Sequence, residues 1–341
     1  MSPTTVNDTY NRPLRDVRVS VTDRCNFRCP YCMPAEIFGE RYKFLPREEL
    51  LTFEEIVRLV GIFVDLGAVK VRLTGGEPLV RKNIESLVEQ LAGVEGIEDL
   101  TMTTNAYLLP SMAQTLKDAG LQRVTISLDS LDDEVFRKMN GRNFGVDTVL
   151  KGIEAAERVG LTPIKINAVV QRGMNDHTLV DMARHFKERG HILRFIEYMD
   201  VGTLNGWRMD DVVSASQIVS MIDTELPLKP VEANYHGEVA RRYRYKDGTG
   251  EIGVIASVTQ PFCGDCTRLR LSPEGSIVTC LFANVGTDLR GPLRAGASDA
   301  DIAEIITRRW RVRDDRYSEE RASMTDELRT REKVEMYHIG G

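Results

Sequence analysis

Apolar and polar positions follow two different periods along the first two thirds of the chain. Short runs rich in β-branched residues alternate with longer stretches in which apolar residues recur every three or four positions. The first pattern is typical of buried strands, and the second of helices with one buried face. Six strands are predicted, at residues 16–22, 69–74, 98–103, 123–128, 162–169 and 192–198. Because a helical pattern or a loop separates each strand from the next, the sequence predicts six βα units.

One predicted helix shows the local signals clearly. Thr52 and Glu55 have the spacing of a capping box, in which each side chain bonds the backbone of the other residue. The apolar residues that follow keep the spacing of one buried helix face until Gly67, where the helix is expected to end. These apolar positions are Ile56, Leu59, Val60, Phe63 and Val64.

Repeated βα units favour an α/β fold with a parallel sheet. Six units are two short of a complete (β/α)8 barrel, so we expect a partial (β/α)6 barrel, with a doubly wound sheet as the alternative. The pattern changes after about residue 201, to one helix near 214–224, shorter strands at 240–245, 253–258, 267–271 and 276–280, and a charged stretch from 299 to 335. We therefore predict a barrel domain at 1–210 and a C-terminal region at 211–341. In either architecture we expect the active site beyond the carboxyl ends of the strands.

Composition narrows the classes of function. The 341 residues are 42% apolar and 28% charged, which is ordinary for a folded protein, and the net charge is −6. This charge gives no global basic field for nucleic-acid binding. The first residues lack the basic start and apolar core of a signal peptide, and no uncharged apolar run reaches the roughly 18 residues of a membrane span. We expect a cytoplasmic protein that binds neither nucleic acid nor membrane.

The six cysteines form two sets of three. Cys25, Cys29 and Cys32 have C-x3-C-x2-C spacing directly after the first predicted strand. Cys263, Cys266 and Cys280 have C-x2-C-x13-C spacing. A structural zinc ion is the alternative for each set, but closed zinc sites need a fourth ligand. Three thiolates can instead hold an iron-sulfur cluster with one iron open to another ligand. Two such sites indicate that one holds a cofactor and the other the substrate.

The first cysteine motif, with Tyr31 before its last cysteine, resembles that of the radical S-adenosylmethionine (SAM) superfamily. The loop Gly75-Gly76-Glu77-Pro78 resembles the superfamily's SAM-binding loop. The chain is further similar, from about Arg15 to its end, to the GTP 3',8-cyclase (MoaA) family of molybdenum cofactor biosynthesis. That similarity rests on Val21-Thr22-Asp23-Arg24, Cys32-Met33-Pro34, Arg194-Phe195-Ile196-Glu197-Tyr198-Met199, the segment from Phe262 to Arg270, and Ile339-Gly340-Gly341.

This resemblance implies two 4Fe-4S clusters and SAM as cofactors. The first cluster would be held by Cys25, Cys29 and Cys32, and the second by Cys263, Cys266 and Cys280. The implied SAM contacts are Tyr31, Gly76, Ser127 and Met199. The implied activity is that of a lyase, which uses a 5'-deoxyadenosyl radical to take the ribose C3' hydrogen of GTP and join C3' to C8 of the base.

The implied GTP site is basic. The residues implied to bind GTP are Arg18, Arg72, Thr103, Lys165, Arg268, Leu269 and Arg270. Lys70 and Arg194 are basic neighbours that could join them, and Gly340 and Gly341 belong to the tail. Of these, Arg18, Arg268 and Arg270 have the implied catalytic role. A solvated surface charge is the alternative for any single basic residue. Lys70 and Arg72, however, lie two apart on one strand, so both face the same side. Charges that face into a barrel need an anionic partner, and a triphosphate supplies one.

The resemblance also implies partners. These are a reductase or flavodoxin-type electron donor and, by product transfer, the downstream cyclic pyranopterin monophosphate synthase. Whether the chain forms a homodimer is left open.

Two alternative functions remain: a radical SAM enzyme with an auxiliary cluster that acts on a peptide or another small molecule, and a non-catalytic iron-sulfur or zinc protein. One departure from the family pattern is Ala106, where Gly is common, and we expect slight strain there if the turn needs positive φ.

Overall fold

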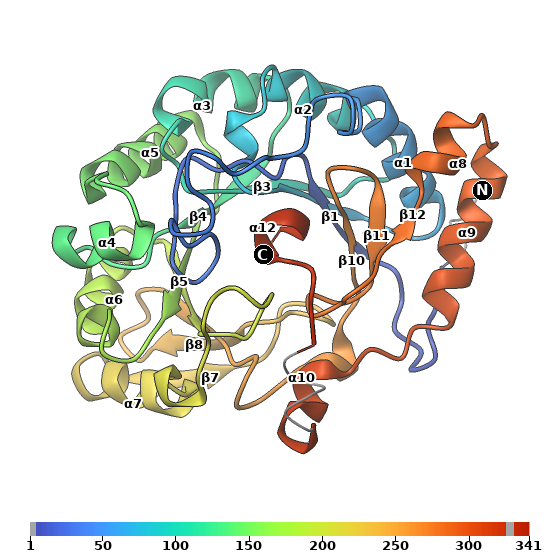
Figure 1. Cartoon of the computed structure of the whole chain (residues 1–341). Coiled ribbons are helices and arrows are strands. Elements are labelled where there is room, and N and C mark those ends of the chain that lie inside the picture. Colours follow the sequence, from blue (N-terminus) through green and yellow to red (C-terminus); the bar gives the residue numbers. More distant parts are fainter. Residues whose placement is uncertain (1–4, 325–330, 341) are drawn as a thin grey trace.

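The computed structural model describes residues 5–324 and 331–340. Six parallel strands, β1 to β6, lie side by side in sequence order at the centre of the sheet. Figure 1 shows this sheet curving inside an outer ring of helices. The strands are β1 Asp16–Ser20, β2 Lys70–Thr74, β3 Asp99–Thr104, β4 Arg123–Ser127, β5 Lys165–Val170 and β6 Ile192–Glu197. The helices of this half are α1 Phe53–Asp65, α2 Ile84–Ala92, α3 Leu109–Asp118, α4 Asp133–Asn140, α5 Val146–Val159 and α6 Leu179–Glu188. The predicted partial (β/α)6 barrel is confirmed.

Strands from the C-terminal region extend this sheet at both edges. Beyond β6 the order is β9, β8, β7, and beside β1 it is β10, β11, β12. β9 and β10 run parallel to their barrel neighbours, whereas the outer strands form antiparallel hairpins. The strands are β7 Leu228–Val231, β8 Arg241–Tyr245, β9 Glu251–Ile255, β10 Arg268–Leu271, β11 Ser276–Val278 and β12 Thr287–Asp288. The helices here are α7 Ala215–Glu225, α8 Arg290–Arg294, α9 Asp299–Arg311, α10 Tyr317–Glu320 and α12 Met336–Ile339. The boundary near residue 210 stays a prediction.

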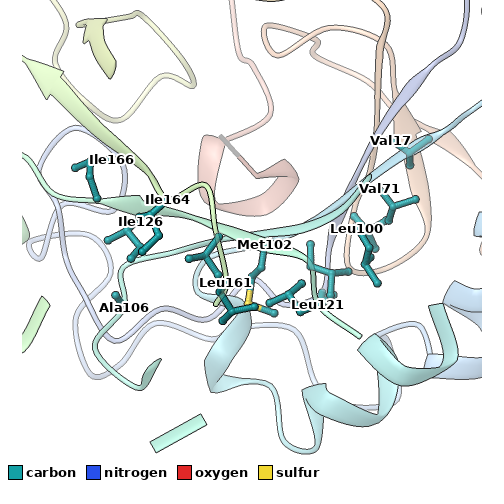
Figure 2. Packing of buried hydrophobic residues seen from close by; sticks show 14 of the residues in the cluster. Val17, Val71, Leu100, Met102, Ala106, Leu121, Ile126, Leu161, Ile164 and Ile166 are labelled. Carbon is teal, nitrogen blue, oxygen red and sulfur yellow. The ribbon is translucent and has the colours of Figure 1, made fainter. Parts of the chain in front are cut away.

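Each barrel strand is apolar on one face and polar on the other. Val17, Val71 and Leu100 are almost fully buried in the layer between the sheet and the helices, and Figure 2 shows them packed in a row. Because side chains alternate along a strand, Arg18 and Arg72 point to the opposite face, the inside of the barrel. The fold therefore uses helices to cover the apolar face and leaves the polar face lining a central space.

Local signals in the sequence act as expected in most places. The Thr52 side chain accepts from the Glu55 backbone N–H at 3.2 Å, and Glu55 accepts from that of Thr52 at 2.7 Å, which confirms the capping box. β5 begins three residues later than predicted, because Pro163 has no N–H to give to a neighbouring strand. β7 was not predicted, and it tolerates Pro230 because it is the edge strand of the sheet.

The expected strain at Ala106 is also present. Ala106 has φ of +59°, in the left-handed region that favours glycine. It lies against α5, where a side chain at Gly152 would approach the Ala106 carbonyl oxygen to 2.6 Å. Glycine at position 152 therefore allows the close packing of α5 on this turn.

Candidate functional site

A large cavity opens inside the barrel, toward the carboxyl ends of the strands. It contains about 1830 Å³ of empty space, counting the part open to solvent. All six cysteines line it, although Cys32 and Cys263 are more than 200 residues apart. The topology explains this meeting, because β10, which follows Cys266, pairs directly with β1, which precedes Cys25. The two cysteine sets thus share one space.

The first cysteine loop is held in place by one arginine. The Arg28 side chain donates to the carbonyl oxygens of Phe38, Cys25 and Phe27 at 2.6 to 2.7 Å. Burial raises the pKa of the Cys25 thiol to about 12 and raises that of Cys29 well above its usual value. Buried thiols of this kind become thiolates when a metal centre takes the place of their protons. Three free thiols with this chemistry, in one loop facing the cavity, fit an iron-sulfur cluster.

The predicted SAM contacts lie around this loop. Tyr31, Gly76, Ser127 and Met199 all line the cavity. Gly76 packs so closely on the cysteine loop that a Cβ there would lie 2.4 Å from the carbonyl oxygen of Arg24. Only glycine fits at this position, as expected for a loop that brings its backbone close to a ligand.

Asp129, which holds Tyr31 in place, was not predicted from any sequence pattern. The Tyr31 hydroxyl donates to Oδ2 of Asp129 at 2.8 Å, and Oδ1 of Asp129 accepts from the backbone N–H of Val169 at the same distance. Asp129 is buried, and this burial raises its pKa to about 6. The aspartate ties the cysteine loop to the ends of β4 and β5.

The second cysteine set rests on a buried ion cluster. Arg12 donates to the carbonyl oxygen of Cys263 at 2.6 Å, and Arg313 donates to that of Cys266 at 2.7 Å. Asp8 accepts from both arginines, at 2.6 and 3.1 Å. All three charged side chains are almost fully buried, so each needs the others for compensation. Asp8 and Arg313 are 305 residues apart, and no sequence pattern pairs them.

The thiol of Cys266 differs from the other five. Burial raises its pKa, but the nearby charges of Arg268 and Arg313 outweigh that effect and lower it to about 6. The Arg268 Nε donates to the Cys266 sulfur at 3.3 Å. The predicted GTP residue Arg268 is therefore already in contact with a ligand of the second cysteine set.

The six thiols do not make a compact site for one ion. Among residues 5–324 and 331–340, no three His, Cys, Asp or Glu side chains are grouped closely enough to hold a single metal ion. The residues that fit a metal centre are the two sets of three cysteines around the cavity.

Arginines with unsatisfied hydrogen-bond donors lie between the two cysteine sets. Arg18, Arg72, Arg194 and Arg270 line the cavity, and each has a buried side-chain nitrogen without a hydrogen-bond partner in the structure. Buried donors of this kind carry a large free-energy cost unless a ligand accepts from them. Arg72 also donates to the hydroxyl of Thr103 at 3.1 Å. The cavity wall thus has the chemistry of an anion site.

Two predicted lysines lie one layer lower, toward the amino ends of the strands. Lys165 is two residues before Asn167, which lines the cavity on the same face of β5. Burial, and then the neighbouring cations led by Arg194, lower the pKa of Lys165 to about 7. Lys70 begins β2 and lies 3.3 Å from Asp99. These lysines extend the basic wall away from the first cysteine set.

The remaining predicted residues have different positions. Leu269 is fully buried in the apolar layer on the other face of β10, so its side chain does not face the cavity and only its backbone could serve a ligand. Gly340 is buried beside Thr74, at the end of β2, and Gly341 lies outside the described residues. Gly340 has φ of +71°, and a Cβ there would lie 2.3 Å from Thr74 Cγ2.

The C-terminal segment enters the centre of the ring, as Figure 1 shows for α12. Tyr337 bonds the hydroxyl of Tyr42 at 2.9 Å and packs on Phe38, which gives a packing role to the loop at residues 35–44. Lys333 donates to Asp200, which directly follows the predicted SAM residue Met199. The tail is thus anchored beside both the cysteine loop and the end of β6.

The amino-acid sequence is similar to those of known proteins. Residues 19–186 match the model of the Radical SAM superfamily, and residues 191–319 match that of Molybdenum Cofactor Synthesis C. A GTP 3',8-cyclase of Acidothermus cellulolyticus is 51% identical, with 98% of this chain and 99% of the relative covered. One of Staphylococcus haemolyticus is 47% identical with the same shares covered.

Solved structures support the fold alone. SuiB of Streptococcus suis bound to S-adenosylmethionine has a TM-score of 0.58 at 16% identity; the match covers 80% of this chain and 61% of that chain, less than two thirds of its length. Superfamily membership implies a 4Fe-4S cluster and SAM. With near-complete coverage of relatives at about half identity, the chain belongs to the GTP 3',8-cyclase family of the radical SAM superfamily.

Proposed function

We propose that this chain converts GTP to (8S)-3',8-cyclo-7,8-dihydroguanosine 5'-triphosphate, the first step of molybdenum cofactor biosynthesis. The observation that carries the proposal is one cavity in which two three-cysteine sets flank arginines, each with a buried side-chain nitrogen that has no hydrogen-bond partner. One thiol set suits the cofactor that starts the reaction. The other set and the arginines suit the two ends of a nucleoside triphosphate, its base and its phosphates.

The first set and its surroundings hold the radical source. When bound, SAM and the first cluster supply a 5'-deoxyadenosyl radical, which takes the C3' hydrogen of the ribose. The chain's part is to hold the cofactor and exclude other hydrogen donors. Tyr31, fixed by Asp129, and the glycine backbone at Gly76 orient it, while Ser127 and Met199 line its walls. Gly340 lies against Thr74, which lines the same cavity.

The second set and the arginines hold GTP. Cys263, Cys266 and Cys280 would carry a second 4Fe-4S cluster, which could supply a binding position for the guanine base. Arg268 links this cluster's ligand Cys266 to the cavity. Arg18, Arg72 and Arg270 each offer a buried donor to the phosphates, and a guanidinium fork suits a phosphate because it donates two parallel bonds.

The proposal extends to the partners of the reaction. Cleavage of SAM needs one electron, and the cyclised nucleotide radical needs a second electron and a proton to give the dihydro product. We assign both electrons to a reductase or flavodoxin-type donor. The product then passes to cyclic pyranopterin monophosphate synthase. Neither step needs a membrane, and no helix of the described residues is long and apolar enough to cross one.

The test is an anaerobic reaction of iron-reconstituted protein with SAM, dithionite and GTP, with ATP as the control. Mass spectrometry should detect 5'-deoxyadenosine and a cyclised isomer of GTP, and no cyclised isomer of ATP. R270M should reduce product formation roughly 10- to 100-fold, because it removes a buried charged donor. R311M, at an exposed position on α9, is the matched control and should behave like wild type. Formation of 5'-deoxyadenosine without a product from GTP would contradict the substrate assignment.

A further inference from the structure

The segment between β7 and β8 covers the amino-terminal end of the barrel, opposite the first cysteine set. Its central residue, Tyr235, lies over Lys70, the first residue of β2. The Lys70 Nζ is 3.3 Å from the Tyr235 hydroxyl and 5.1 Å from the centre of its ring. Val239, at the end of the same segment, lines the cavity. The segment therefore runs from the outer surface of the barrel to the wall of the substrate space.

The other end of this segment touches the second cysteine set. His236 lies 3.2 Å from Asp265, which stands between Cys263 and Cys266. Gly237 has φ of +86°, and a Cβ there would lie 2.9 Å from the Asp265 carbonyl oxygen. The segment thus bridges β2 and the second cysteine loop, and it crosses the basic end of the cavity between them.

These contacts are weak enough to open. Tyr235 is 44% exposed, and both His236 and Asp265 are about two thirds exposed. Exposed ion pairs contribute little to stability, and an exposed cation–π contact adds only a modest amount. Lys70, in contrast, is mostly buried and already has Asp99 as a partner. Tyr235 and His236 can therefore leave their partners at little cost, while Lys70 stays in place. This suits a segment that moves when substrate binds.

The charges under this segment match a phosphate chain. The Tyr235 and Glu238 side chains lie near Arg194, and Tyr235 also lies near Arg72. A negative group that entered beside these arginines would also lie near the Tyr235 hydroxyl. That hydroxyl can donate to a phosphate oxygen, and the same phosphate would draw Lys70 from Asp99.

We propose that residues 232–238 close the phosphate end of the cavity, and that Tyr235 together with Lys70 contacts the terminal phosphate of the bound nucleoside triphosphate. The inference rests on the proposed function and deepens it by adding a binding residue. It also places the terminal phosphate at the end of the barrel opposite the first cysteine set.

The first experiment is equilibrium binding of GTP and GMP to the cluster-loaded protein. Y235A should raise the Kd for GTP roughly 5- to 20-fold, and Y235F roughly 3-fold, because the first loses the ring and the hydroxyl and the second only the hydroxyl. The Kd for GMP, which lacks the terminal phosphate, should change less than twofold. Y243F is the control, since Tyr243 lies on β8 of the same hairpin and packs against the apolar layer.

The second experiment needs no variant. Amide hydrogen exchange of residues 232–239 in wild-type protein should slow when GTP is added and stay unchanged with SAM alone. Equal GTP affinity of wild type and Y235A, or exchange that GTP does not alter, would overturn the inference in a protein that cyclises GTP. A wild-type protein that forms no cyclised product, in contrast, contradicts the proposed function itself.

Discussion

We expect the clustered positive charges of the cavity to lower the stability of the substrate-free protein. Lys165 allows this to be tested directly. Its pKa is lowered from 10.5 to about 7, first by burial and then by Arg194 and the other cations. If the whole difference appears as free energy, charging this lysine in the folded state costs roughly 5 kcal/mol. Water penetration and relaxation reduce such costs, so about 2 to 5 kcal/mol is the range expected. K165M, which keeps the length of the side chain without its charge, should therefore stabilise the protein.

The sign and the pH window follow from linkage. The folded-state pKa lies below the unfolded one, so between about pH 7 and pH 10.5 the unfolded chain binds more protons, and wild type gains stability as the pH rises. K165M lacks this dependence. The stability advantage of K165M should thus be largest at pH 6 and fall below about 1 kcal/mol at pH 10.

The assay is thermal unfolding of the cluster-loaded, substrate-free protein under anaerobic conditions. For a chain of this size, the expected advantage at pH 6 corresponds to a Tm higher by roughly 3 to 8 °C, which shrinks to about 1 °C at pH 10. K151M, at an exposed lysine on α5, is the control and should show no such dependence. GTP should raise the Tm of wild type more than that of K165M. A K165M variant that is less stable than wild type at pH 6, or equally stable at both pH values, would refute the reasoning.

Three further predictions concern the cysteine sets and the tail. D8N should leave the buried Arg12 guanidinium without its carboxylate and Arg313 with Asp315 alone, at a cost of about 3 to 5 kcal/mol. It should release iron from the second site before the first on heating; simultaneous loss from both sites would contradict this. C32S and C280S should each halve the iron content, and only C280S should keep SAM-dependent changes in the cluster's electron paramagnetic resonance spectrum. G340A should abolish cyclisation while the iron content stays normal, because its Cβ would clash with Thr74. Wild-type turnover would show that the tail can move away from Thr74 without loss of activity.

The barrel and much of its interior follow from alternation along single strands. Lys70 and Arg72 were predicted to face the same side because they lie two apart, and the observed strand β2 places Arg72 in the cavity with Lys70 one layer below. The same rule explains Leu269, which lies between Arg268 and Arg270 and therefore faces the apolar layer. Its implied substrate role came from the family pattern alone.

The supports of the site were beyond sequence reasoning, because they join distant segments. Asp8 pairs with Arg313, and Asp129 with Tyr31, across separations that carry no periodic signal. Tyr235 likewise lies in an exposed turn-like stretch, and its meeting with Lys70 depends on how β8 pairs with β9. Alternation predicts which face a residue occupies, but only the strand order shows what stands across from it.

The pairing of β1 with β10 affects how the chain forms during synthesis. β1 ends at Ser20, whereas β10 begins at Arg268, so the outer edge of the first strand stays open until most of the chain has left the ribosome. Open strand edges are sites of aggregation. A nascent chain that stalls between β6 and β10 thus exposes an unpaired parallel edge and half of the metal-binding thiols. We expect the late stages of translation, rather than the folding of the first βα units, to decide how much of this protein matures.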